Sequence, residues 1–275
     1  LGDALDLVAL GTVADVVPLD LNNRILVARG LARIRSGRAR PGIEALFEVA
    51  GRDYRQATAS DLGFIVGPRL NAAGRLDDMS IGIECLLAES SMEARERAET
   101  LHRLNRERRD IEQTMEQDAL KQLASLSFDA TELPFAMTLY DPDWHQGVIG
   151  ILASRVRERI HRPTVVFAET GDEMLKGSGR SIQGLHLRDA LDQVATRYPG
   201  LLHKFGGHAM AAGLTLAKSD LLQFTGALEQ VVADALEHVP PVPVDDSDGG
   251  LSSEDFSLAL ADELSRGGPW GQHFP

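Results

Sequence analysis

One long amphipathic segment divides this chain and limits the folds that it can adopt. From Ser90 to about Leu126 the sequence has no proline or glycine, and apolar residues recur every three to four positions. Ser90 and Glu93 have the spacing of a capping box at its start. About 36 residues at ~1.5 Å each predict a helix about 50 Å long. Its other faces are dense in Arg and Glu, and Arg108 interrupts the apolar stripe. This pattern favours a solvated connector between two domains over a coiled-coil dimer seam.

The sequence differs on the two sides of this helix, and together they predict an α/β protein. Residues 1–88 read as helices separated by Gly and Pro. Residues 128–238 alternate strand-like and helical runs, which is typical of a second, small α/β domain. A stiff linker, Pro240–Pro243, then opens the segment 239–275, which we expect to be the poorly ordered start of a truncated third domain. The strand-like runs are Phe135–Tyr140, Thr164–Ala168, Leu175–Ile182 and Ala212–Ala217.

The charge distribution leaves room for a polyanionic partner in an acidic protein. The formal net charge of −13 argues against such a partner at first sight. However, nine acidic residues and no Lys or Arg lie between Val232 and Leu264. Between Lys176 and His208 there are five Lys or Arg, three His and only two Asp. A local basic surface is therefore expected in the second α/β segment.

Cysteine usage and hydropathy predict the compartment. The single cysteine, Cys85, excludes an internal disulfide and a multi-thiolate metal site, and it indicates a reducing compartment. No run of about 18–20 apolar residues occurs, so we expect no transmembrane span and no membrane partner. No signal-peptide pattern follows Leu1, which predicts a cytoplasmic protein. Leu1 in place of Met, and the turn-like run before Pro275, indicate ends that were cut from something longer.

Asp15 is the first candidate for chemistry. It lies in Gly11-Thr12-Val13-Ala14-Asp15-Val16-Val17-Pro18, among small and branched apolar residues. An isolated carboxylate in such a setting is costly unless it is hydrogen-bonded, paired or bound to a metal. The pattern by itself favours a capping or ion-paired role over metal binding.

A second cluster places two guanidinium groups and one amide on a backbone kept thin by Ala and Gly. Its residues are Arg69, Asn71 and Arg75, within Gly67–Arg75. Arginine forks suit bidentate contact with phosphate, and small residues let a ligand approach the backbone. A surface loop paired with the aspartates that follow is an equally good interpretation.

Two glycine-rich runs lie in the second α/β segment. The first contains Ser178 and Arg180, and the second places His208 directly after two glycines. Glycines expose backbone N–H groups to an anion, while hydroxyl, guanidinium and imidazole groups add donors. Together the runs favour a ligand site over two tight turns.

The run Asp141-Pro142-Asp143-Trp144-His145 invites a metal site. Pro142 predicts an irregular turn there, and Asp143 or His145 can cap the helix that follows. We therefore favour a turn over a metal site.

Five short motifs resemble those of the DHH phosphoesterase superfamily, and they occur in the family's order. The run Leu7–Leu19 is similar to the fourth motif of that superfamily. With the other four, the chain resembles the bacterial single-strand-specific DNA exonucleases of the superfamily nearly end to end. The other motifs are Pro68–Arg75, Trp144–Gly150, Ser178–Arg180 and Gly206–His208.

The resemblance implies a plan of domains that matches the boundaries above. Residues 1–88 would be the C-terminal part of the DHH catalytic domain, and residues 89–127 the connecting helix. Residues 128–238 would be the DHH-associated substrate-binding domain. Residues 239–275 would be a linker and the truncated start of an OB-type domain.

The resemblance also implies roles for the candidate residues. Asp15 would be a catalytic ligand of a Mn²⁺ or Mg²⁺ centre. The residues that would hold the DNA strand are Arg69, Asn71, Arg75, Ser178, Arg180 and His208. The family's remaining ligands come from an upstream Asp-x-Asp motif, a further Asp and an Asp-His-His motif, which are absent here. One carboxylate cannot hold a hydrolytic metal pair.

The implied activity is metal-dependent 5′-to-3′ hydrolysis of single-stranded DNA, in recombination and repair. We expect it of the intact protein, and expect this chain by itself to be inactive. Two alternatives stay open. One is another DHH phosphoesterase that cleaves short oligonucleotides or nucleotide phosphates, and the other is a non-catalytic nucleic-acid-binding module.

Overall fold

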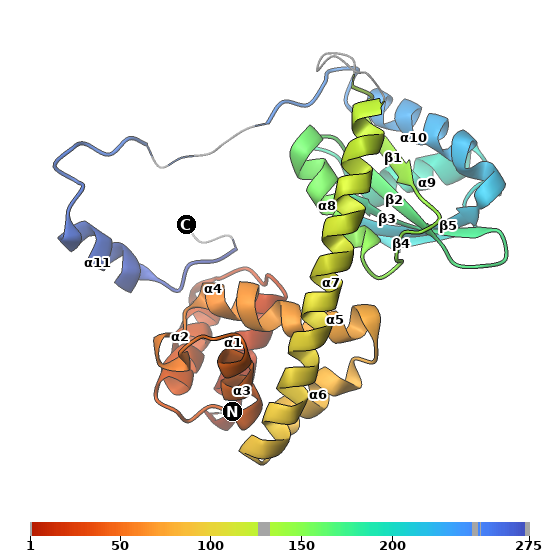
Figure 1. The fold of residues 1–275 in the computed structure, drawn as a ribbon. Coiled ribbons are helices and arrows are strands. Elements are labelled where there is room, and N and C mark those ends of the chain that lie inside the picture. The colour runs from red at the N-terminus through yellow and green to blue at the C-terminus, as the bar shows by residue number, and fades with distance from the viewer. Residues whose placement is uncertain (1, 126–132, 244–246, 248, 273–275) are drawn as a thin grey trace. The chain divides into compact units, whose positions relative to one another are not determined.

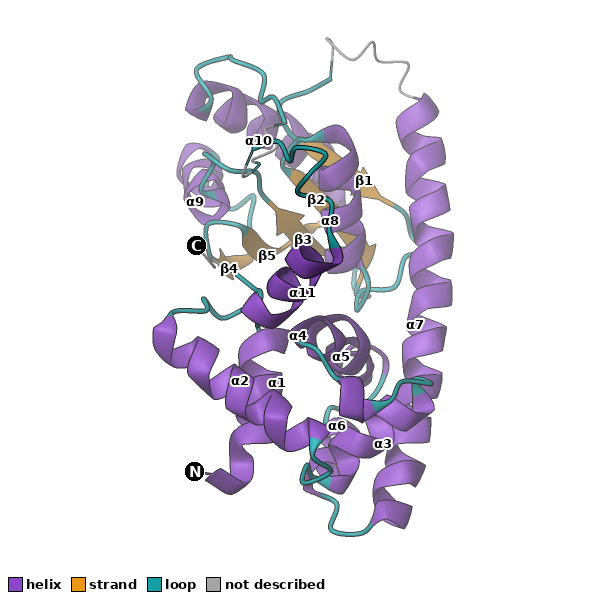
Figure 2. Cartoon of the chain, turned by 90° about the vertical axis from the view of Figure 1, so that its left-hand side faces the viewer, coloured by secondary structure: helices purple, strands orange, loops and turns teal. Residues whose placement is uncertain are grey.

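The fold, given by a computed structural model, consists of two compact units. The structure describes residues 2–125, 133–243, 247 and 249–272 (Figure 1). One unit comprises Leu1–Arg108 with Ser247–Pro275, and the other Arg109–Asp246. Figure 2 shows that the strands all belong to the second unit, whereas the described part of the first is built from helices. The α/β class is therefore confirmed for the chain as a whole.

The first unit packs its helices around one apolar core. Leu31, Ile34 and Leu46 are almost fully buried in it. No helix in the described part of the chain is long and apolar enough to cross a membrane. The helices of this unit are α1 (Leu5–Ala14), α2 (Leu21–Arg35), α3 (Pro41–Val49), α4 (Ala59–Asp61), a π-helix (Leu62–Val66), α5 (Gly67–Leu76), α6 (Ser80–Leu87), the first part of α7 (Ser91–Ser125) and α11 (Leu258–Gly267).

The expected long helix is α7, and its start is capped as the sequence predicts. The Glu93 N–H donates to Ser90 Oγ at 3.2 Å. The N-cap of α2 is Asp20, whose carboxylate accepts from the Asn23 N–H at 2.8 Å. An aspartate at this position satisfies one of the free N–H groups of the first turn.

A buried aspartate joins the start of the chain to α3. Asp6 is 0% exposed, and its carboxylate accepts hydrogen bonds from the Leu7 N–H at 3.0 Å and the Arg40 N–H at 2.7 Å. Arg33 Nε lies 3.9 Å from the same carboxylate. A buried charge is stable only with such partners. Asp6 therefore connects α1 to α2 and to the start of α3 through polar contacts.

We expect Asp6→Ala to lower the free energy of unfolding by about 3 kcal/mol, because it leaves buried donors and a guanidinium without their acceptor. Asp6→Asn keeps one acceptor oxygen and should lose less. Urea unfolding of the two variants and the parent measures both values. An alanine variant within about 0.5 kcal/mol of the parent would contradict the role of Asp6, because that is the range of ordinary surface substitutions.

The second unit is a five-stranded sheet with helices on both faces. The strand order is β1-β2-β3-β5-β4; β1 and β2 are parallel, and the other pairs are antiparallel. The second part of α7 and α8 cover one face, and α9 and α10 cover the other. The elements are β1 (Met137–Tyr140), α8 (Ile149–Ile160), β2 (Thr164–Glu169), β3 (Met174–Arg180), α9 (Leu187–Arg197), β4 (Lys204–Gly207), β5 (Ala211–Ala217) and α10 (Leu221–Ala235).

Four of these strands match the predicted runs, and β4 is an addition. Residues Lys204–Gly207 belong to a run that the sequence predicts to be a glycine-rich loop. They form an edge strand because each residue pairs with β5, from Lys204 opposite Thr215 to Gly207 opposite Ala212. Pairing in the sheet overrides the low strand propensity of glycine.

The described part of the C-terminal segment forms α11, which has no buried residue, so poor order of this segment stays a prediction. Two hydrogen bonds link the end of α11 and the chain after it to the first unit. The Leu19 N–H donates to Gln272 O at 2.9 Å, and Arg24 Nη2 donates to Gly267 O at 3.1 Å. Between 239 and 272 the described residues include this helix and no strand, so the start of an OB-type domain stays a prediction.

Candidate nucleic-acid interface

Strand β3 carries two different sets of side chains on its two faces. Gly177 and Gly179 face the core, where an added Cβ would lie 2.5 Å from Phe167 and 2.7 Å from Leu187. Lys176, Ser178 and Arg180 alternate with them and lie on the opposite face, which α8 covers in part. The glycines therefore allow close packing. The expectation that they offer backbone N–H groups to an anion is wrong, because β3 lies between β2 and β5 and its backbone pairs with both.

Ser178 and Arg180 form one polar group above α8. Arg180 Nη1 lies 3.2 Å from Ser178 Oγ and donates to Gly179 O at 2.8 Å. An added Cβ at Gly150, on α8, would lie 2.9 Å from Arg180 Nη2 and 3.0 Å from Ser178 Oγ. Gly150 therefore provides the space in which the guanidinium lies. A hydroxyl and a guanidinium in contact suit one phosphate group.

His208 lies near the same end of the sheet. The turn that carries it joins the end of β4 to the start of β5, and the His208 N–H donates to Ala211 O at 2.8 Å. Ala211 is the residue paired with Arg180. The topology therefore places the turn of His208 beside the end of β3 that carries Ser178 and Arg180. Gly207 has φ +143°, and its Cβ would lie 2.4 Å from Ala211 O, so the turn before His208 requires glycine there.

The outer face of β5 and β4 is open beside this group. Ser178, Gly213 and Gly206 form one row across the three strands. An added Cβ at Gly206 would meet nothing within 4 Å, and one at Gly213 only Gly177 O at 3.9 Å. The row next to it contains Lys176, Thr215 and Lys204.

Charge on this open face has one sign. β3, β4 and β5 contain Lys176, Arg180 and Lys204 and no acidic residue. Among the described residues the structure records an ion pair for Lys218, with Glu169, but none for Lys176 or Lys204. Sequence reasoning missed both lysines as site residues, although the two-residue period running from Lys176 through Ser178 to Arg180 could have found the first.

Asp15 lies in the first unit, at the C-terminal end of α1. Its side chain is exposed, and within the described part of the chain no group donates to its carboxylate. Asp15 does occupy the C-cap position of α1, where its backbone N–H donates to Gly11 O at 3.0 Å. The expected ion pair of its side chain is not found among the described residues. The next residue, Val16, adopts φ +54°, and the chain leaves the helix in a Schellman motif, with hydrogen bonds from Val16 N–H to Val13 O and from Val17 N–H to Thr12 O.

The residues present do not make up a metal centre. No group of three or more His, Cys, Asp or Glu that could hold a metal ion exists among the described residues. In the run from Asp141 to His145, Asp141 accepts from the Asp143 N–H at 3.0 Å and His145 Nδ1 accepts from the Gly147 N–H at 3.1 Å. These two contacts make that run a turn.

The cluster at Arg69, Asn71 and Arg75 is helical and does not form one contact surface. All three lie on α5, where Arg69 is only 5% exposed. Arg69 Nη1 donates to Ile65 O at 2.6 Å, and its Nε lies 3.3 Å from His102 Nδ1. Arg69 is therefore part of the packing, whereas Asn71 and Arg75, one turn apart, share the opposite, more exposed face. The expectation of one three-residue loop cluster is wrong.

Other titratable groups are explained by packing. Burial raises the pKa of the Cys85 thiol to about 11, although Arg97 acts in the opposite direction. This thiol stays protonated at neutral pH. The hydrogen bond from Lys218 is the main cause that lowers the pKa of Glu169 and raises that of Lys218.

Comparison with known proteins first defines the class of the second unit. Residues 133–234 match the model of the DHHA1 domain, and this range contains the whole sheet with Ser178, Arg180 and His208. The sheet with its cationic open face therefore lies within the region that is similar to the DHHA1 domain.

The chain as a whole is homologous to RecJ, the single-stranded-DNA-specific exonuclease. It is 55% identical over 275 residues to RecJ of Dickeya dadantii, covering 100% of this chain and 48% of that protein. It is 33% identical over 274 residues to RecJ of Bacillus subtilis, covering 99% and 34%. The chain thus spans about half the length of the first of these relatives.

Solved structures of a RecJ protein are also similar to this chain. The crystal structure of Thermus thermophilus RecJ in complex with Mg²⁺ has a TM-score of 0.85 and 32% identity, covering 100% of this chain and 41% of that one. The complex of the same protein with Mn²⁺ gives the same TM-score and identity. The resemblance found in the sequence is confirmed.

Proposed function

We propose that this chain is the strand-binding part of a metal-dependent, single-stranded-DNA-specific exonuclease. The intact enzyme would degrade DNA from the 5′ end with Mg²⁺ or Mn²⁺, act in recombination and repair, and work in the cytoplasm. The chain would contribute one carboxylate, Asp15, to the metal centre. The names and metals of the RecJ relatives support this proposal. Because the residues present do not form a metal centre, no catalytic step is derived for them.

The arrangement of Ser178 and Arg180 beside the open face is the observation that supports strand binding. A guanidinium held by Gly179 O and seated over Gly150 is positioned before a ligand arrives. Preorganisation lowers the entropic cost of binding. The rows of Gly213 with Gly206 and of Lys176 with Lys204 extend from it, so a flexible strand can lie on the sheet with its phosphates near cations. The face would read the backbone and not the sequence.

This role can be tested by filling the glycine row. Gly206 has an ordinary extended φ and open space above it, so Gly206→Val should fold normally and keep the melting temperature. The valine would occupy the place of the strand. We expect affinity for a fluorescent oligothymidine, measured by anisotropy, to fall at least about 10-fold, which corresponds to about 1.4 kcal/mol.

The matched control is Gly226→Ala. Gly226 lies on α10, on the other side of the sheet, and an added Cβ there meets nothing within 4 Å. This variant should bind like the parent. Equal affinity of the parent and Gly206→Val would show that the strand does not cross the sheet at this row, and no binding by the parent would overturn the proposed function.

A further inference from the structure

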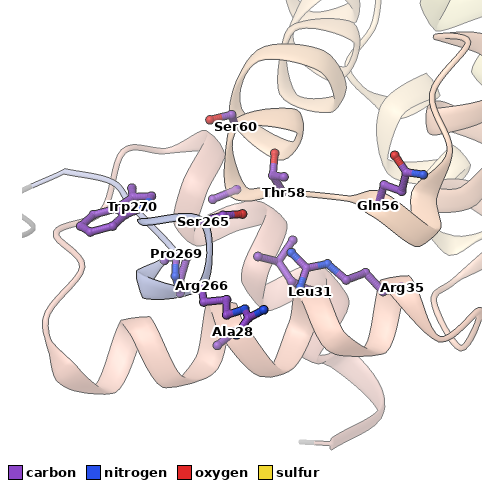
Figure 3. Close-up of a pocket in the computed structure, with 12 residues that line it drawn as sticks. Ala28, Leu31, Arg35, Gln56, Thr58, Ser60, Ser265, Arg266, Pro269 and Trp270 are labelled. Carbon is purple, nitrogen blue, oxygen red and sulfur yellow. The ribbon is translucent and has the colours of Figure 1, made fainter. Parts of the chain in front are cut away.

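A large cavity lies in the first unit, and none of the candidate site residues lines it. Its volume is about 680 Å³, within the range of small-molecule sites. Helix α2, the segment around α4, and the end of α11 with the chain after it form its walls (Figure 3). The polar side chains that line it are Arg35, Gln56, Thr58, Ser60, Ser265 and Arg266.

The charge of this cavity is opposite to that of the whole chain. The chain has a formal net charge of −13, yet the cavity is lined by two arginines and no acidic residue. Figure 3 shows the guanidinium groups of Arg35 and Arg266 directed over Ala28 and Leu31, from two elements far apart in sequence. Paired guanidinium groups match the geometry of a phosphate.

One of the two guanidinium groups is fixed and open to a ligand. Arg35 Nε donates to Ala57 O at 2.7 Å. No described residue accepts from its two terminal nitrogens. The other, Arg266, forms one ion pair within the described ranges, with the carboxylate of Asp262 at 3.7 Å, and both of these side chains are exposed. Both arginines can therefore turn their donors toward an anion.

The rest of the lining favours an organic anion over an inorganic one. Trp270 forms part of the wall and is 49% exposed, with its Nε1 donating to Leu264 O at 3.0 Å. Ala28, Leu31 and Pro269 add apolar surface. An indole that is held by its N–H and is half-exposed can contribute surface to the binding of a base. The hydroxyls of Ser60 and Ser265 can bond a sugar.

The wall that carries Trp270 and Arg266 is attached to the rest of the unit. Arg24 Nη2 donates to Gly267 O at 3.1 Å, and the Leu19 N–H donates to Gln272 O at 2.9 Å. These two bonds lie on either side of Trp270. The cavity is therefore closed by a segment with defined anchors.

We propose that this cavity binds a nucleotide. The phosphate would lie between Arg35 and Arg266, and the base would contact Trp270. The ligand is a nucleoside 5′-monophosphate, either free or as one unit of a strand. This site does not depend on the proposed function, because none of its residues belongs to the sheet of the second unit.

The chain contains its own reporter for this site. Because it has two tryptophans, Trp144→Phe leaves Trp270 as the single tryptophan. Trp144 is only 4% exposed. In this background, deoxyadenosine monophosphate should quench the emission saturably. Deoxyadenosine and inorganic phosphate should each bind at least about 10-fold more weakly, since each lacks one half of the contacts.

Variants of the two arginines complete the test. Arg35→Ala and Arg266→Ala should each weaken deoxyadenosine monophosphate about 10-fold. Arg29→Ala, on an exposed part of the same helix but outside the lining, should change nothing. A 5′-phosphorylated oligonucleotide distinguishes the two sources: competition with the monophosphate indicates a strand unit, and its absence a free nucleotide. Absence of saturable binding by both fluorescence and calorimetry, or equal loss in Arg29→Ala, would overturn the proposal.

Discussion

Incubated with single-stranded DNA and Mg²⁺ or Mn²⁺, this chain is expected to release no mononucleotides. Two-metal hydrolysis needs several carboxylate or imidazole ligands around the ions. The described residues supply no such group, and Asp15 stands without another ligand. We therefore expect no detectable nuclease activity under conditions in which a full-length RecJ homologue is active. Release of acid-soluble label from an end-labelled oligonucleotide measures it.

Asp15→Asn separates true activity from contamination in that experiment. A trace nuclease from the preparation would act equally in the parent and the variant. Hydrolysis by the parent that disappears in Asp15→Asn would show that the chain assembles a working metal centre, contrary to this expectation. Strand affinity should be the same in both, because Asp15 lies in the first unit and the proposed strand-binding face in the second.

Replacing Arg180 by alanine should produce the largest change in strand affinity. A charge-assisted hydrogen bond to phosphate contributes roughly 1.5–3 kcal/mol, so binding of oligothymidine should weaken about 10- to 150-fold. Loss of one phosphate contact should also reduce the slope of log K against log salt by about 0.7 for a single strand. Anisotropy titrations across a salt series measure both quantities.

Two further variants show whether the effect depends on the position of the guanidinium. Arg188→Ala removes an exposed charge on α9, which covers the other face of the sheet, and should leave both quantities unchanged. Gly150→Ala keeps Arg180 but places a methyl group 2.9 Å from its Nη2, so it should weaken binding as well. An Arg180→Ala chain that binds like the parent at every salt concentration would exclude Arg180 from the interface.

Periodicity predicted the regular parts of this fold well. The connecting helix and four strands lie where the apolar spacing places them. Strand β4 was missed because two of its four residues are glycine, and only its partner β5 makes it a strand. An edge strand of this kind has no local signal.

The candidate site could be predicted only in part, because it too depends on pairing between strands. The turn of His208 lies beside the end of β3 that carries Ser178 and Arg180 because the register of the sheet aligns them. The cluster on α5 failed because Gly67 and Pro68 indicate a loop, whereas proline is well accepted in the first turn of a helix. In a helix, each residue is rotated by about 100° from the one before it, so Arg69 and Asn71 lie on different sides of α5. The cavity beside Trp270 could not be predicted, since it needs walls more than 200 residues apart in the chain.

The backbone at Val16 has an implication at the level of the gene. A β-branched residue with φ +54° costs about 1–2 kcal/mol, and glycine would avoid it. Valine and glycine codons differ by one base, so a single mutation is enough to remove the strain. The side chain is 61% exposed and contributes little to the core of this unit. The strain at Val16 therefore lies in the residue that directly follows Asp15, the carboxylate proposed as a metal ligand.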